Sequence, residues 1–364
     1  MISKTKRHLT LAIAAAALNC ALPFAHAQTP RVIKISHQFP AASSEDGDFR
    51  DRLVRRFAAE VEKQSKGSLK FEIYPGSSLM KTNSQIGALR KNALDMSLVP
   101  LAYGGGEIPA VNLTLMPTLV SSYEQGMRWK TAPIGKELDR ILSDKNIKIV
   151  TWVWQAGGIA STKRAVVVPD DAKGLKFRGG SKEMDQMLKG AGAAVTGMPS
   201  SEIYSAMQSG VLDAALTSST SLISFRLQEF TKFATSARNK SFWFMFEPLL
   251  ISKGLYDSLT PEQQKIITEV GASLEKFGVE EAKKDDLRMA EVFTKAGAKV
   301  SDMDEKAFMA WRAVAEQTAF KDFAENIKDG RALLDMALSV QESPGRAWPG
   351  RPSIKVNHEP RIFH

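Results

Sequence analysis

Residues that carry reactive chemistry are scarce in this sequence of 364 residues. It holds one cysteine, Cys20, and five histidines, of which only His37, His358 and His364 lie beyond residue 27. A single cysteine excludes a disulfide framework and a cysteine-based zinc site. The His-Glu-x-x-His motif of zinc proteases and the Gly-x-Ser-x-Gly turn of hydrolases are absent too. The composition therefore predicts a binding protein rather than an enzyme, with no metal and no cofactor.

Long apolar runs are also absent beyond the N-terminal segment, since no later stretch approaches the length of a membrane span. Residues 1–27 have the pattern of a secretory signal peptide: a basic start, an apolar stretch, and an Ala-x-Ala cleavage site at Ala25–Ala27. Asn19, before Cys20, disfavours lipid attachment at that cysteine. We therefore expect an exported protein that begins at Gln28 and works in the periplasm of a Gram-negative bacterium.

A large surplus of one charge sign is missing as well. The formal net charge is +9, and the signal peptide carries three basic residues and no acid, so its removal leaves +6. The remaining basic residues are interspersed with acidic ones, and no basic stripe alternates with aromatic residues. The pattern therefore argues against nucleic-acid binding, whereas a modest positive charge favours the attraction of anionic solutes.

What the sequence does contain is an alternation of strands and helices between Gly174 and Asp213. A strand at 175–177 ends at Arg178, a helix capped by Ser181 follows, and the alternation continues to a third strand. This order predicts a parallel sheet with crossover helices, and such sheets bind ligands beyond the carboxyl ends of their strands. The guanidinium fork of Arg178 is suited to a carboxylate. The alternative is a surface arginine that ends a strand.

The same stretch carries a specific motif. Met198–Asp213 reads Met-Pro-x-Ser-Glu-x-Tyr-x-Ala-x-Gln-x-Gly-Val-x-Asp, and Gly174–Arg178 reads Gly-Leu-Lys-Phe-Arg. With Leu94–Val99 and Leu249–Gly271, these segments resemble the solute-binding proteins of tripartite ATP-independent periplasmic (TRAP) transporters, the dicarboxylate-uptake family. The resemblance implies capture of a small organic acid and its delivery to integral membrane permease subunits driven by an ion gradient. In that family, the arginine matched by Arg178 pairs with the ligand carboxylate.

Further candidate site residues follow from the resemblance and from the predicted strands. His37 follows a strand at 32–36, where the family has a loop that faces the cleft; a structural histidine is the alternative. Gln155 lies where the family's chain crosses between domains, and Trp243 lies in an apolar run that returns to the first domain. Trp243 is a candidate wall of the cleft, with burial in a sheet as its alternative. Tyr103–Gly106 is predicted to be a flexible cleft loop.

Three positions depart from the family pattern. Gly158 stands where many members have a second ligand-binding arginine, and Ser200 where many have a phenylalanine that stacks on the ligand. The family's ligand-bonding asparagine is replaced by Thr217 or Ser218, whose hydroxyls can still donate hydrogen bonds to an acid. These departures favour a monocarboxylate with an apolar or aromatic body; a short dicarboxylate or a keto acid is the alternative.

The resemblance implies an α/β, two-domain periplasmic-binding-protein fold with a hinge and a ligand cleft between the domains. We expect residues 28–155 plus 240–283 to form domain I, and residues 156–239 plus 284–340 to form domain II with the C-terminal helices.

A helix that begins after Thr260 runs without a proline to about Lys295, and in the family it spans both domains. The tail over 341–364 is rich in Pro, Gly and Arg and is predicted to be poorly ordered. We expect a monomer. The binding component of an ATP-driven (ABC-type) uptake system, a ligand-presenting sensor and an exported enzyme remain as alternatives.

Overall fold

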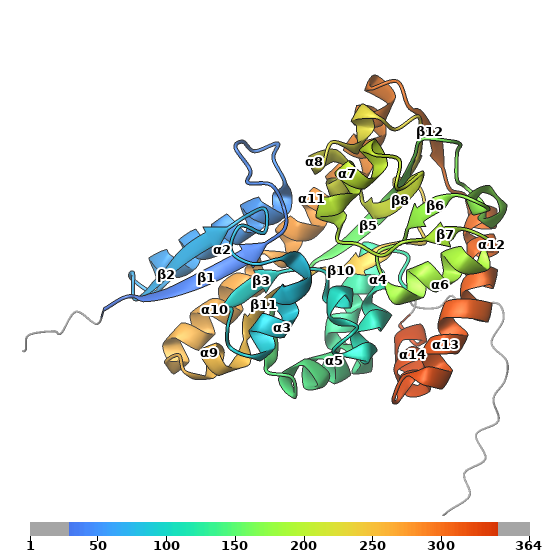
Figure 1. Cartoon of the computed structure of the whole chain (residues 1–364). Helices are drawn as coiled ribbons and strands as arrows, with labels where there is room; N and C mark the ends of the chain where they lie inside the picture. Colours follow the sequence, from blue (N-terminus) through green and yellow to red (C-terminus); the bar gives the residue numbers. More distant parts are fainter. Residues whose placement is uncertain (1–28, 341–364) are drawn as a thin grey trace, which may run out of the picture.

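The structure is a computed structural model that describes residues 29–340 of the chain. The predicted signal peptide, Cys20 and the predicted tail lie outside the described residues. Within residues 29–340, no helix is long and apolar enough to cross a membrane. This part of the chain forms two β-sheets, each covered by helices (Figure 1).

The first sheet has five strands in the order β2-β1-β3-β11-β4. β1 runs parallel to β2 and β3, whereas β11 runs antiparallel between β3 and β4. Helix α2 packs on this sheet because apolar side chains recur every four residues along its buried side. We call this half the first lobe. Its strands are β1 (Arg31–His37), β2 (Leu69–Tyr74), β3 (Met96–Leu98), β4 (Ile147–Thr151) and β11 (Leu249–Ser252). Its helices are α2 (Phe49–Gln64), α3 (Gln85–Arg90), α4 (Tyr123–Arg128), α5 (Pro133–Ser143), α9 (Lys253–Asp257) and α10 (Pro261–Ser273).

The second sheet has seven strands, ordered β12-β9-β5-β8-β6-β7, with β10 paired to β5. β6 runs parallel to both β7 and β8, which confirms the predicted parallel arrangement of this strand–helix series. We call this half the second lobe. Its strands are β5 (Trp154–Ser161), β6 (Lys176–Arg178), β7 (Ala194–Val195), β8 (Ala214–Ser218), β9 (Phe233–Ser236), β10 (Phe244–Phe246) and β12 (Lys299–Asp302). Its helices include α6 (Lys182–Gly190), α7 (Ile203–Gln208) and α8 (Ser219–Ser224).

The chain passes between the lobes at several points. It leaves the first sheet after β4, enters β5 at Trp154, and returns between β10 and β11 at Glu247. A long helical segment also joins the lobes, since α10 packs on β4 and α11 (Glu275–Lys295) packs on α8 and β5. This segment has the predicted span, but it is interrupted at Leu274, where ψ falls to −7°. The assignment of residues to two domains stays a prediction.

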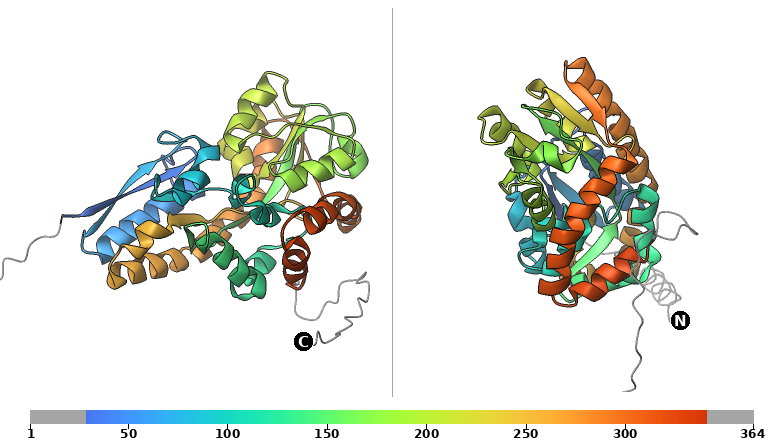
Figure 2. Two further views of the ribbon diagram at one scale, coloured as in Figure 1. Left: turned by 60° about the horizontal axis from the view of Figure 1, so that its bottom comes forward. Right: turned by 90° about the vertical axis from the view of Figure 1, so that its right-hand side faces the viewer.

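The last helices form a second bridge along one side of the molecule (Figure 2). α12 (Glu305–Ala315) and a π-helical turn at Glu316–Phe320 pack against α6 of the second lobe. α13 (Lys321–Asn326) leads into α14 (Gly330–Leu338), which packs against α5 of the first lobe. The C-terminal helices therefore touch both lobes.

Candidate functional site

Arg178 ends strand β6 and is almost fully buried, with 1% of its surface exposed. Its Nε donates to the Met198 carbonyl oxygen at 3.0 Å, and its Nη1 donates to the Leu216 carbonyl oxygen of β8 at 2.7 Å. Gly180 leaves room for the guanidinium, because a Cβ there would lie 2.7 Å from Nη1. The φ of Gly180, 102°, also lies in the region that favours glycine. The turn after β6 is therefore fitted to this arginine.

The charge of Arg178 has no partner of opposite sign. Three arginines are buried among the described residues, and two of them form ion pairs: Arg50 with Asp48 at 2.7 Å and Arg312 with Glu316 at 2.6 Å. Arg178 instead bonds only to neutral oxygens, and no carboxylate of residues 29–340 lies within ion-pair distance of it. An unpaired buried charge is costly, so this arginine marks a place where a ligand carboxylate would be stabilised.

Asp185 on α6 supports the turn that follows Arg178. Its carboxylate lies against this turn, since a Cβ built at Gly179 would be 2.5 Å from Oδ1 of Asp185. Burial raises the pKa of Asp185 to about 6, although the positive charge of Arg178 opposes the rise. Asp185 therefore helps to hold the turn without forming an ion pair with the arginine.

Tyr103 reaches Arg178 from the first lobe. It lies in a 3₁₀ turn, Leu101–Gly104, that follows β3. Its hydroxyl oxygen accepts a hydrogen bond from Nη2 of Arg178 at 2.8 Å and another from the backbone N–H of Ser200 at 3.0 Å. The two lobes therefore meet at the arginine. The sequence predicts a cleft loop at Tyr103–Gly106 but does not reveal this contact.

Two predicted site residues, Trp243 and Thr217, lie beside Arg178. The indole N–H of Trp243 donates to the Gly179 carbonyl oxygen at 3.2 Å. Its ring covers Gly157, where a Cβ would lie 2.3 Å from a ring carbon. Thr217 is buried on β8, directly after the residue whose carbonyl oxygen accepts from Arg178. Trp243 is itself only 1% exposed, so it is packed into the wall of the site.

Ser218 and Gln155 lie in a different cluster, where the chain passes between the lobes. The Ser218 hydroxyl caps α8 and also accepts from Nη1 of Arg50 at 3.3 Å. Gln155 donates to Glu247, which accepts from Nη1 of Arg50 at 3.4 Å. Burial raises the pKa of Glu247 to about 7, and the charge of Arg50 opposes the rise. These two predicted site residues are therefore engaged with Arg50 and not with Arg178.

His37, the remaining predicted site residue, is fully buried at the end of β1. Its Nδ1 accepts the backbone N–H of Phe39 at 3.2 Å, so Nε2 carries the ring proton and bonds to Asp51 at 3.0 Å. Both ring nitrogens are occupied by the protein. This arrangement supports the structural alternative for His37.

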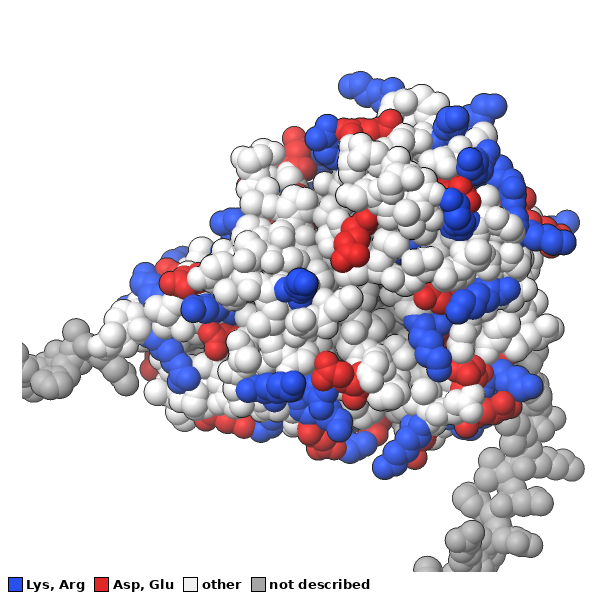
Figure 3. All heavy atoms as spheres, in the orientation of Figure 1, with Lys and Arg blue, Asp and Glu red and all other residues white. Residues whose placement is uncertain are grey.

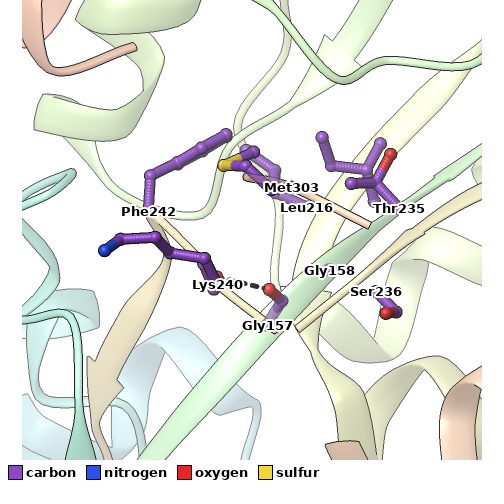
Figure 4. A pocket seen from close by; sticks show the side chains of 10 residues that line it. Gly157, Gly158, Leu216, Thr235, Ser236, Lys240, Phe242 and Met303 are labelled. Atoms are coloured by element: carbon purple, nitrogen blue, oxygen red, sulfur yellow. Dashed lines mark hydrogen bonds between the residues drawn. The ribbon is translucent and has the colours of Figure 1, made fainter. Parts of the chain in front are cut away.

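Gly158, the position of the missing second arginine, lines a small cavity beside β5 (Figure 4). The cavity has a volume of about 10 Å³, room for a single water molecule, and Thr235, Ser236 and Met303 lie around it. A Cβ at Gly158 would lie 2.3 Å from the Thr235 carbonyl oxygen. The backbone of β9 therefore blocks any side chain at this position, and the packing of the sheet requires a glycine.

A larger pocket, of about 380 Å³, lies apart from Arg178, where Arg140 of α5 and Leu333 of α14 are among its lining residues. Among residues 29–340, no group of three or more His, Cys, Asp or Glu residues is placed to hold a metal ion. Basic and acidic side chains are interspersed over the face seen in Figure 3. The candidate site therefore consists of Arg178 with Tyr103, Ser200, Thr217 and Trp243 around it.

A family model and two similar proteins all identify the chain as similar to bacterial solute-binding proteins. The model described as bacterial extracellular solute-binding protein, family 7, matches residues 42–326. A solute-binding protein of Albidiferax ferrireducens is 57% identical over 318 residues, which cover 87% of this chain and 94% of that protein. The C4-dicarboxylate-binding periplasmic protein of Rhodobacter capsulatus is 29% identical over 252 residues, which cover 66% of this chain and 74% of that protein.

A solved structure agrees with these relatives. The crystal structure of a TRAP periplasmic solute-binding protein from Rhodoferax ferrireducens, with bound malonate, matches with a TM-score of 0.83 and 56% identity. The match covers 85% of this chain and 98% of that one. The predicted fold, periplasmic location and non-enzymatic binding function are confirmed. The chain belongs to family 7 of the bacterial extracellular solute-binding proteins, the periplasmic receptors of TRAP transporters.

Proposed function

We propose that this protein captures a small organic acid between its lobes, with one carboxylate of the acid paired to Arg178. The unpaired buried charge of Arg178 carries the proposal. Protein oxygens accept three of its hydrogen bonds, and a guanidinium has five N–H groups, so two remain for a ligand. A bidentate carboxylate would use them and neutralise the charge at the same time.

A short dicarboxylate is the ligand class that we favour. The Rhodoferax ferrireducens protein, 56% identical, holds malonate in its crystal structure. In this chain Trp243 packs against Gly157 and bonds to Gly179, so its ring is not a free platform for an apolar or aromatic body. The monocarboxylate favoured by the sequence alone becomes the second candidate. It is supported by Arg50, because Asp48 already neutralises the charge of that arginine. Arg50 therefore offers no free cation to a second carboxylate in the part of the chain that the structure describes.

The partner that we propose for the loaded protein is the pair of integral membrane permease subunits of a TRAP transporter. Membership of the family supports this partner over an ATP-driven permease or a membrane sensor. Closure of the two lobes around the ligand, in a monomer, would give the permease a surface that distinguishes loaded from empty protein.

Thermal unfolding of residues 28–364 against a panel of acids tests the ligand and the site together. The panel holds malonate, succinate, propionate, phenylacetate and pyruvate. An acid at 100 times its dissociation constant should stabilise the wild type by about 2.7 kcal/mol. Arg178→Ala should abolish this stabilisation for every acid, because the only unpaired cation of the site is gone.

A control variant and a control measurement make the result of this test interpretable. Arg238→Ala, which removes an arginine of the second lobe paired with Asp302 at the surface, should respond to ligand as the wild type does. Unfolding curves of Arg178→Ala without any acid show whether the variant is folded, because the change also removes three hydrogen bonds and leaves a cavity. A response to the same acid in Arg178→Ala and wild type would overturn the assignment of Arg178.

A further inference from the structure

The hydroxyl group of Tyr103 accepts two hydrogen bonds and donates none to the described residues. A phenol oxygen has two acceptor lone pairs and one proton to donate. Both lone pairs are taken, one by Nη2 of Arg178 at 2.8 Å and one by the backbone N–H of Ser200 at 3.0 Å. No atom of residues 29–340 accepts the hydroxyl proton. Tyr103 therefore presents an unused donor directly beside the unpaired charge of Arg178.

The surroundings hold this donor in place. Arg178 is fixed by the carbonyl oxygens of Met198 and Leu216, so its Nη2 holds the phenol oxygen at a defined point. Accepting a hydrogen bond from a cation polarises the phenol and strengthens its own donation. The side chain of Tyr103 is only partly buried, unlike that of Arg178.

We propose that Tyr103 is a specificity-determining residue of this site: its hydroxyl donates to the ligand carboxylate that Arg178 binds. The inference rests on the proposed function. An ionised carboxylate is acceptor-only, so it can take the Tyr103 proton and the free guanidinium protons together. The amide group of a carboxamide presents donors as well, and these would oppose Tyr103 and Arg178 across the same contact.

Tyr103 also links recognition to closure of the lobes. It belongs to the first lobe, whereas Arg178 and Ser200 belong to the second. The hydrogen bond from Tyr103 to a carboxylate on Arg178 can therefore form only when the lobes meet. A ligand that supplies the acceptor stabilises the closed form, and one that cannot supply it binds the second lobe alone.

The test is calorimetric titration of wild type, Tyr103→Phe and Tyr204→Phe with malonate and with malonamide. Phe keeps the ring and removes only the hydroxyl. Tyr204→Phe is the matched control, because its hydroxyl bonds to Glu229 at the surface of the second lobe. We expect Tyr103→Phe to weaken malonate binding by about 10- to 100-fold, the range for a hydrogen bond to a charged group. Malonamide binding should stay weak and unchanged, and Tyr204→Phe should match the wild type.

Small-angle scattering supplies a readout that a purely structural tyrosine would not move. At saturating malonate, the wild type should contract and Tyr103→Phe should contract less, with unfolding curves showing that both are folded. Unchanged or tighter malonate binding in Tyr103→Phe would overturn the inference; tighter binding would mean that the hydroxyl competes with the ligand.

The outcomes separate the inference from the function on which it rests. If Arg178→Ala loses malonate and Tyr103→Phe keeps it, only the role of Tyr103 fails. If Arg178→Ala binds malonate as the wild type does, the proposed site fails. Failure of the wild type to bind malonate would overturn the short dicarboxylate as ligand and this inference with it.

Discussion

Gly158 illustrates how a single residue limits the chemistry of the site. The resemblance to the family predicts a second arginine at this point, and the packing of the sheet explains why the chain has none. The carbonyl oxygen of Thr235 lies 2.3 Å from where a Cβ would be, so β9 is packed against the bare backbone of β5. Evolution or design cannot restore an arginine here without moving a strand.

Replacing Gly158 by Ala should therefore destabilise the protein by about 2 kcal/mol, the usual cost of overpacking. Urea unfolding measures the change as a lower midpoint at unchanged slope. Gly106→Ala is the control, because nothing lies within 4 Å of a Cβ built at that glycine. If Gly158→Ala were as stable as Gly106→Ala, β9 would have to be mobile and the steric argument would fail.

Arg178 could be predicted from the sequence because its neighbours in the chain place it. The strand before it and the Gly179–Gly180 turn after it are local signals, and the family motif gives its role. Tyr103 could not be predicted as its partner, because 75 residues separate them and the contact depends on how the lobes meet. The sequence predicts that Ser218 and Gln155 line the site. It does not show that Ser218 accepts a hydrogen bond from Arg50 and that Gln155 shares Glu247 with Arg50.

At the scale of elements, Arg50 joins three segments of the chain. It lies in the first turn of α2 and bonds bidentately to Asp48, with Nε at 2.9 Å and Nη2 at 2.7 Å. Its Nη1 reaches Ser221 of α8 at 2.9 Å and Glu247, between β10 and β11, at 3.4 Å. The guanidinium therefore ties a helix of one lobe to a helix of the other and to a crossing between them.

Arg50→Met should cost about 3–5 kcal/mol, because it leaves the Asp48 and Glu247 carboxylates buried without a cation. The measurement is again the urea midpoint. Lys63→Met is the matched control on the same helix, since Lys63 forms only an exposed pair with Glu60 and should cost under about 0.5 kcal/mol. If Arg50→Met lowered the free energy of unfolding by an amount within 1 kcal/mol of the control, the hydrogen bonds and ion pairs of Arg50 would not stabilise the contact between the lobes.

The series of strands and helices from Gly174 to Asp213 could be predicted because glycines and serine caps punctuate it. The interruption of the long helical segment at Leu274 could not, since neither proline nor glycine marks that residue. Its physical context is tertiary: α10 packs on the first sheet and α11 on the second. Arg50 likewise lies in a helical stretch rich in arginine, where no local signal separates it from its exposed neighbours.

The whole molecule buries several carboxylates whose pKa values rise. Burial raises the pKa of Glu183, Glu247 and Asp286 to about 7 in each case. Such groups hold a proton in the folded state at pH values where the unfolded chain has lost it. Their contribution to stability is therefore complete below their unfolded pKa and is lost as the pH rises through 7. Both carboxyl oxygens of Glu183 lack a hydrogen-bond partner. Burial alone therefore accounts for the raised pKa of Glu183 more simply than for that of the other two residues.

Glu183→Gln should accordingly remove part of this pH dependence. At pH 8 the variant should be more stable than the wild type by up to about 3 kcal/mol, because it never ionises, and at pH 4, below the ordinary pKa of glutamate, the two should be nearly equal. Unfolding curves at the two pH values measure the difference. Glu60→Gln, at an exposed glutamate of α2, should follow the wild type. An equal gain at both pH values would show that packing, and not ionisation, distinguishes the variant.

The order of strands in the two sheets has a consequence for how the newly synthesised chain folds. β4 pairs only with β11, so it has no neighbour until Ser252 has been made, and β12, which completes the other sheet, ends at Asp302. A chain that emerges N-terminus first can pair β1 with β2 and β3 early, but it cannot complete either sheet until β11 and β12 have been made. Neither sheet is therefore complete while the chain is being made, which leaves most of the polypeptide without a finished core until its last third is available.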